Sequence, residues 1–132
     1  MTPELTALAL AGLLQTVQFV LMSVPVNREL GSARTTAPRD GDDLMRDLSP
    51  KTARLVRALN NHFEALILFT IAVLVVTLSN QSTALTQYAA YTYLAARTLY
   101  VPAYYFGWQP WRSAIWCVGL TATVLMILST LL

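Results

Sequence analysis

The chain has 132 residues, of which 55% are hydrophobic and only 12% are charged. A soluble domain usually carries about 25% charged residues, so the composition excludes an ordinary soluble domain. The length indicates that the chain forms one domain. The net charge of +2 is too small to suggest a nucleic-acid partner, and no basic run alternates with aromatic residues. With one histidine (His62) and one cysteine (Cys117), the sequence offers no Cys/His cluster for a metal.

Four apolar stretches predict membrane-spanning helices. A helix of about 20 apolar residues matches the hydrocarbon core of a bilayer and leaves no backbone group unpaired within it. The predicted fold class is therefore all-α, an integral membrane four-helix bundle formed by one domain, residues 1–132. We expect the four spans at about residues 5–24, 55–78, 84–105 and 112–132.

The three connections between these spans differ in length and charge. Twelve of the sixteen charged residues lie between Arg28 and Arg57, mostly in the long first connection, residues 25–54. Near its end, Ser49–Pro50 predicts a helix start, because proline is favoured at the first helical position. The other two connections are short, so the last three helices should be antiparallel neighbours.

The basic residues indicate an orientation. The first and third connections, with the helix ends beside them, carry every lysine and arginine except Arg97. The tendency of basic loops to remain in the cytoplasm predicts that these two connections are cytoplasmic and that both termini lie on the opposite side.

Polar side chains gather at the predicted cytoplasmic ends of the last three helices. Arg57, Asn61 and Glu64 lie in the first turns of the second span, within about 60° of one another around the helix. The last turns of the third span carry a second stripe, and the fourth span begins at Arg112. That second stripe consists of Tyr93, Arg97, Tyr100 and Tyr104.

Such clustering needs a reason, because a charge toward the membrane centre costs about 2.5–3.5 kcal/mol and usually pairs or lines a cavity. Some alternatives remain open. Arg57 and Arg112 can extend to lipid headgroups, and Glu64 and Arg97 can form a purely structural ion pair. His62 points about 140° away from Arg57 and is expected to be a packing residue.

These residue types suit a small zwitterionic peptide. Arginines bind carboxylates, a glutamate binds an ammonium group, and asparagine and tyrosine bind peptide amides. Glutathione, which has two carboxylates and one amine, is the candidate ligand that is abundant in the cytoplasm.

The motifs also resemble those of a known family. "RALNNHFE" at the start of the second span, with the pattern Arg-x3-Asn-x2-Glu, resembles the signature of the MAPEG family, the membrane-associated proteins in eicosanoid and glutathione metabolism. "ARTLYVPAYY" followed by "WRS" resembles that family's third-helix and fourth-helix motifs, and the resemblance covers essentially the whole chain.

The resemblance implies a homotrimer that binds glutathione between neighbouring subunits at the cytoplasmic side. Arg112 would lie near the sulfur, and either Arg28 or Arg34 would match a further family arginine. The implied glutathione-binding residues are Arg57, Asn61 and Glu64 from one subunit, Arg97, Tyr100 and Tyr104 across the interface, and Ser113.

The implied activity is that of a glutathione-dependent transferase or peroxidase, with a lipophilic small molecule or membrane lipid as second partner. Arg112 is the expected catalytic residue, because a guanidinium in a partly desolvated site favours a thiolate over a thiol. Ala65 and Tyr100 differ from the tyrosine and histidine of some members, which leaves the substrate open. The alternative is a non-enzymatic membrane scaffold or lipid-binding subunit with the same fold.

Overall fold

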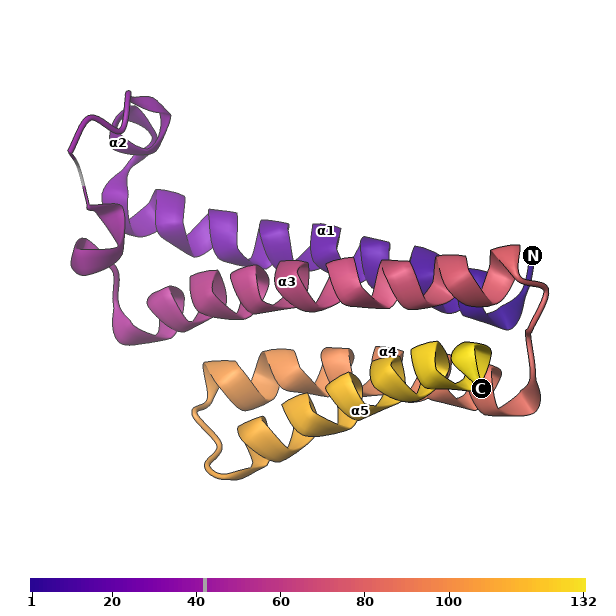
Figure 1. Cartoon of the computed structure of the whole chain (residues 1–132). Helices are drawn as coiled ribbons and strands as arrows, with labels where there is room; N and C mark the ends of the chain where they lie inside the picture. Colours follow the sequence, from indigo (N-terminus) through magenta and orange to yellow (C-terminus); the bar gives the residue numbers. More distant parts are fainter. Residues whose placement is uncertain (42) are drawn as a thin grey trace.

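The computed structural model describes residues 1–41 and 43–132, and all regular secondary structure within these ranges is helical. Two short elements, α2 (Ser32–Thr36) and the 3-10 helix η1 (Leu44–Asp47), lie in the first connection. The long helices are α1 (Pro3–Leu30), α3 (Pro50–Leu78), α4 (Ala84–Tyr105) and α5 (Trp111–Leu131). Both termini lie at one end of the bundle, and the α4–α5 turn lies toward the other (Figure 1).

Side-chain caps explain where three of the long helices begin. The Thr2 hydroxyl accepts a hydrogen bond from the Leu5 amide, and the Ser49 hydroxyl accepts one from the Thr52 amide, each at 3.3 Å. In both cases a proline follows the capping residue. Thr83 and Thr86 bond each other's backbone amides at the start of α4, forming a capping box. These caps satisfy amides that have no partner within the first helical turn.

Two helices extend beyond the expected membrane spans. α1 continues through Pro25 to Leu30 instead of ending near residue 24. α3 begins at Pro50, which confirms the helix start predicted at Ser49–Pro50 and lies a few residues before the span expected from about residue 55. Gly31, with φ at +84°, ends α1 and donates its amide to the Asn27 carbonyl at 2.9 Å. A residue with a side chain adopts this φ only at a cost. The polar first connection is therefore shorter than the expected 25–54.

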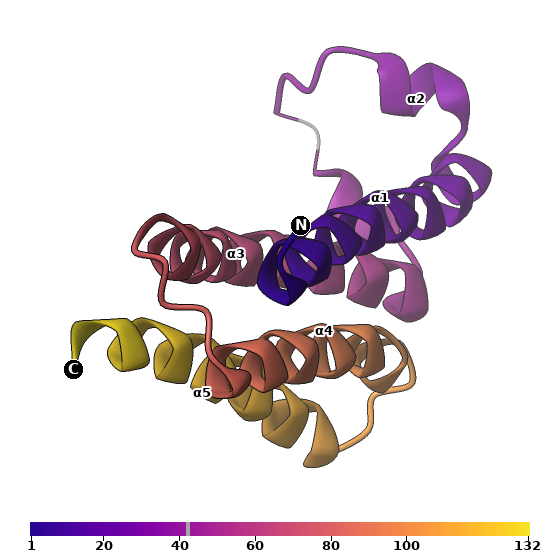
Figure 2. The same cartoon turned by 90° about the vertical axis from the view of Figure 1, so that its right-hand side faces the viewer.

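Small residues let the four helices approach closely. α1 packs against α3 and α4, while α5 packs against α4 and α3. Figure 2 shows α1 and α3 forming one layer over α4 and α5. Ala7, Ala11, Ala72 and Ala90 are fully buried in the core, as is common where helices pack within a membrane.

The outer surface is strongly apolar. Leu13, Phe19 and Phe63 are each more than half exposed, and similar side chains cover the outer faces of the other helices. α1, α3 and α5 are each long and apolar enough to cross a membrane. The fourth expected span, α4, lacks that apolar composition, because polar side chains such as Arg97 and Tyr100 lie along it.

Candidate functional site

A hollow of about 420 Å³ opens between α3, α4 and α5, near the α4–α5 turn. Seven of the eight predicted site residues line it, and the eighth, Arg97, lines a smaller chamber that adjoins it. The lining residues of the hollow are Arg57, Asn60, Asn61, Glu64, Tyr100, Tyr104, Arg112, Ser113 and Trp116. The polar stripes read from the sequence thus meet at one place.

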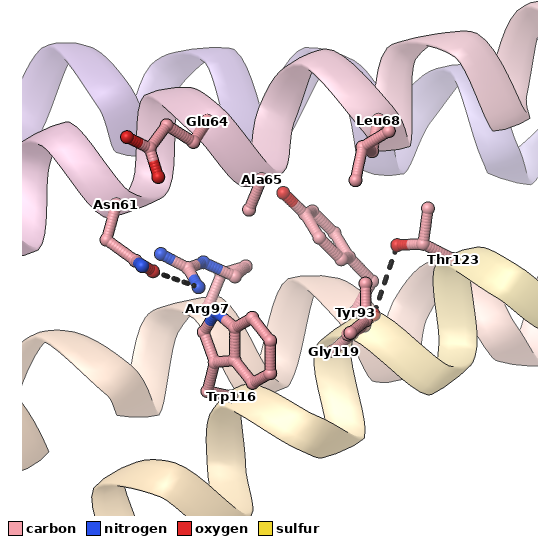
Figure 3. Close-up of a pocket in the computed structure, with 10 residues that line it drawn as sticks. Asn61, Glu64, Ala65, Leu68, Tyr93, Arg97, Trp116, Gly119 and Thr123 are labelled. Atoms are coloured by element: carbon pink, nitrogen blue, oxygen red, sulfur yellow. Dashed lines mark hydrogen bonds between the residues drawn. The ribbon is translucent and has the colours of Figure 1, made fainter.

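Both stripes belong to the same chain. The resemblance implies that α3 contributes one half of the site and α4 of a neighbouring subunit the other half. In the structure, Nη1 of Arg97 on α4 donates to Oδ1 of Asn61 on α3 of the same chain, at 3.0 Å (Figure 3). Asn61 and Arg97 are thus already in contact within one chain.

Arg97 is held on three sides. Its side chain is only 2% exposed, its Nε donates to Nδ1 of His62 at 3.3 Å, and its guanidinium carbon lies 4.4 Å from the Tyr100 ring centroid. Its Nη2 is buried and has no hydrogen-bond partner among the residues that the structure describes. A buried guanidinium nitrogen without a partner is costly, so this atom is suited to an incoming acceptor.

His62 fixes the orientation of Arg97. The imidazole is fully buried, and its Nε2 lies 3.1 Å from the carbonyl oxygen of Ala11 on α1. Because a carbonyl only accepts, Nε2 must carry the hydrogen, which leaves Nδ1 free to accept from Arg97. The sequence predicted a packing residue. His62 is indeed buried, but it also links α1, α3 and α4 through hydrogen bonds, which a helical projection of one helix cannot reveal.

The other charged groups of the site form no ion pair with any residue that the structure describes. Arg112 lies over the Tyr104 ring, 4.8 Å from its centroid. In the described part of the chain, neither Arg57 nor Arg112 donates a hydrogen bond through its side chain, and Glu64 forms no ion pair with Arg97. The alternative of a structural Glu64–Arg97 pair is therefore wrong, and these charges remain available to a ligand.

Some lining residues were not predicted. Trp116 follows Arg112 by four positions, so helical spacing already places it on the same face of α5. Asn60 carries no such signal. Neither Arg28 nor Arg34 lines the hollow, and Arg34 lies 2.6 Å from a carboxylate oxygen of Asp47.

The arrangement can bind a small ligand with several negative groups and one positive group. Arg57, Arg97 and Arg112 supply three positive charges, and Glu64 supplies one negative charge. The volume falls within the range of about 300–1,000 Å³ typical of small-molecule sites. The tyrosines and Asn61 add hydrogen-bonding groups that recognise amides.

The fold and this hollow together define an all-helical membrane protein with a charged site at one end of its bundle. The family model of the MAPEG family matches residues 7–132, and the chain belongs to that family. Comparison with curated proteins and with solved structures gave no significant match.

Proposed function

We propose that this protein is a glutathione-dependent membrane enzyme, a transferase or peroxidase acting on a lipophilic electrophile or hydroperoxide. The observation that carries the proposal is the hollow between α3, α4 and α5, in which Arg57, Glu64 and Arg112 form no ion pair with any described residue. Membership of the MAPEG family supports the broader assignment to membrane-bound glutathione or eicosanoid metabolism.

The charges of the hollow match those of glutathione group by group. In this proposal, Arg57 and Arg97 bind the two carboxylates, and Glu64 binds the ammonium group. Asn61, Tyr100, Tyr104 and Ser113 bind the peptide amides. The unpartnered Nη2 of Arg97 supports the fit, because a carboxylate would complete its hydrogen bonding.

Arg112 is the proposed catalytic residue. Glutathione supplies a thiol, whose deprotonated form is the nucleophile. Arg112 lines the hollow beside Tyr104, where its positive charge stabilises a thiolate against its thiol. Lowering a thiol pKa by about 2 units requires about 2.7 kcal/mol, and a partly desolvated guanidinium can supply this.

The proposal includes four spans and a homotrimer. The 22 residues of α4 extend about 33 Å, which suffices for a fourth span even though this helix is the most polar of the four. The shared location of both termini, and the basic residues near the α4–α5 turn, support a hollow facing the cytoplasm. The exposed apolar side chains of the outer surface would contact lipid and the neighbouring subunits.

Calorimetric titration of glutathione into the protein in detergent tests the proposal. We expect saturable binding to the wild type and binding about tenfold weaker to Glu64→Gln, which loses the partner of the ammonium group. Glu29→Gln is the matched control, because Glu29 lies at the end of α1 outside the hollow.

Measurement of turnover then distinguishes an enzyme from a non-enzymatic scaffold. An enzyme should conjugate 1-chloro-2,4-dinitrobenzene to glutathione or reduce cumene hydroperoxide at its expense. Absence of both glutathione binding and turnover would overturn the proposal in favour of the non-enzymatic scaffold or lipid-binding subunit.

A further inference from the structure

A second chamber, of about 160 Å³, lies behind the hollow between α3, α4 and α5 (Figure 3). It shares Asn61, Glu64 and Trp116 with the hollow and has Arg97 beside this shared wall. Its other lining residues are Ala65, Leu68, Tyr93, Gly119, Leu120 and Thr123. The glutathione site proposed above uses Asn61, Glu64 and Arg97 on this side of the chamber and leaves its remaining lining residues unassigned.

The hydroxyl group of Tyr93 is the unexplained feature of the chamber. Tyr93 is 1% exposed, and its hydroxyl oxygen has no hydrogen-bond partner among the described residues. Stacking fixes the ring against Phe69, with centroids 3.8 Å apart and planes 12° from parallel. In Figure 3 the hydroxyl points from α4 toward α3, beside Ala65. Because a buried hydroxyl without a partner is unfavourable, this fixed group is suited to a ligand oxygen.

The rest of the chamber is mostly apolar. Ala65, Leu68 and Leu120 contribute aliphatic surface, and the Thr123 hydroxyl is already bonded to the Gly119 carbonyl at 3.0 Å. An apolar cavity of about 150 Å³ is large enough to hold a benzene ring. The chamber therefore suits one ring or a short chain that carries an acceptor oxygen, with the remainder of the molecule in the adjoining hollow.

We propose that this chamber binds the oxygen-bearing end of an apolar ligand, with the Tyr93 hydroxyl as its hydrogen-bond donor. Organic hydroperoxides and carbonyl compounds share this chemistry. The assignment of that ligand as the enzyme's electrophile rests on the function proposed above, since the shared wall brings it next to the hollow that holds Arg112. Binding itself requires no glutathione.

Two nearly isosteric probes test the proposal without glutathione. Acetophenone has a ketone oxygen where α-methylstyrene has a methylene group, and neither consumes a thiol on the timescale of a titration. Dissociation constants are measured by ligand-observed NMR at one fixed detergent concentration. We expect wild-type protein to prefer acetophenone by about threefold to tenfold, the contribution of one hydrogen bond. Tyr93→Phe, which keeps the ring stacked on Phe69, should lose this preference.

Tyr91→Phe is the matched control, because it removes the same hydroxyl from the exposed side of α4 and should leave the preference unchanged. Equal binding of the two probes to the wild type would show that the chamber does not recognise the ketone oxygen and would overturn the proposal. A preference that persists in Tyr93→Phe would overturn it too. If glutathione does not bind but the Tyr93-dependent preference for acetophenone is found, the proposed function is wrong and the proposed ligand site in the chamber still stands.

Discussion

His62 on α3 accepts a hydrogen bond from Arg97 on α4, with 3.3 Å between Nδ1 and Nε. The same imidazole is tied through Nε2 to the Ala11 carbonyl on α1, at 3.1 Å. A group that α1 holds thus orients the one guanidinium of the site that is almost fully buried. The position of Arg97 therefore depends on the packing of α1, although no residue of α1 lines the hollow.

We predict that His62→Leu weakens glutathione binding by about tenfold and lowers the thermal stability of the protein in detergent. Leucine leaves Nε of Arg97 buried without its partner, which costs about 1–3 kcal/mol. His62→Asn is the conservative variant, since its side-chain oxygen can replace Nδ1 as acceptor. Calorimetry should show partial recovery of affinity with asparagine, and equal affinity of both variants would contradict an orienting role for His62.

The sequence predicts the site better than it predicts the ends of the helices. The stripes on α3 and α4 follow from helical spacing alone, because residues three and four positions apart share a face. The structure places these two stripes around the hollow and the smaller chamber that adjoins it. The continuation of α1 beyond Pro25 could not be read from hydropathy, since proline removes only one helical hydrogen bond and Gly31 supplies the actual end. The bond between His62 and Arg97 depends on which helix faces which, and no single-helix projection contains that information.

Arg112→Ala should reduce turnover about 100-fold while changing the dissociation constant of glutathione severalfold at most. The reason is that the proposed charge stabilises the thiolate rather than the bound peptide, and about 2.7 kcal/mol corresponds to 2 units of thiol pKa. Steady-state kinetics with 1-chloro-2,4-dinitrobenzene and calorimetry measure the two quantities separately.

Arg54→Ala provides the control for this substitution. Arg54 lies near the same turn, but its Nη1 donates to the Tyr105 carbonyl at 3.2 Å and it does not line the 420 Å³ hollow. It should keep most of the turnover. Full turnover in Arg112→Ala would exclude Arg112 as the thiolate-stabilising group.

At the opposite end of the bundle, Glu4 should matter for stability and not for binding. Glu4 is fully buried, and its Oε1 accepts hydrogen bonds from the hydroxyls of Ser82 at 2.8 Å and Thr86 at 2.5 Å. Glu4→Leu removes this acceptor and leaves the buried Thr86 hydroxyl without it, which should destabilise the fold by about 1 kcal/mol or more.

Thermal denaturation in detergent measures that loss, and glutathione titration should give an unchanged affinity. Glu29→Leu is the matched control, because exposed Glu29 accepts the Ser49 amide at 2.8 Å and water can replace it there. A drop in glutathione affinity with Glu4→Leu at full stability would show that the two ends of the bundle are coupled.

Gly119 allows α5 to approach α4, and its substitution should depend sharply on side-chain size. A Cβ at this position would lie 3.6 Å from the Ala96 Cβ and 3.8 Å from side-chain atoms of Arg97 and Tyr93, all ordinary contact distances. Gly119→Ala should therefore be tolerated. Gly119→Leu adds atoms beyond that contact and should destabilise the protein by about 1–3 kcal/mol through overpacking.

Gly12→Leu controls for the general effect of leucine in place of a helical glycine, because a Cβ at Gly12 on α1 would meet nothing within 4 Å. Its melting temperature in detergent should match or exceed that of the wild type, since glycine is a poor helix former. If Gly119→Leu melts at the same temperature as Gly12→Leu, then α4 and α5 do not pack as closely at Gly119 as described. Gly119 would then not form part of the wall of the chamber beside Tyr93.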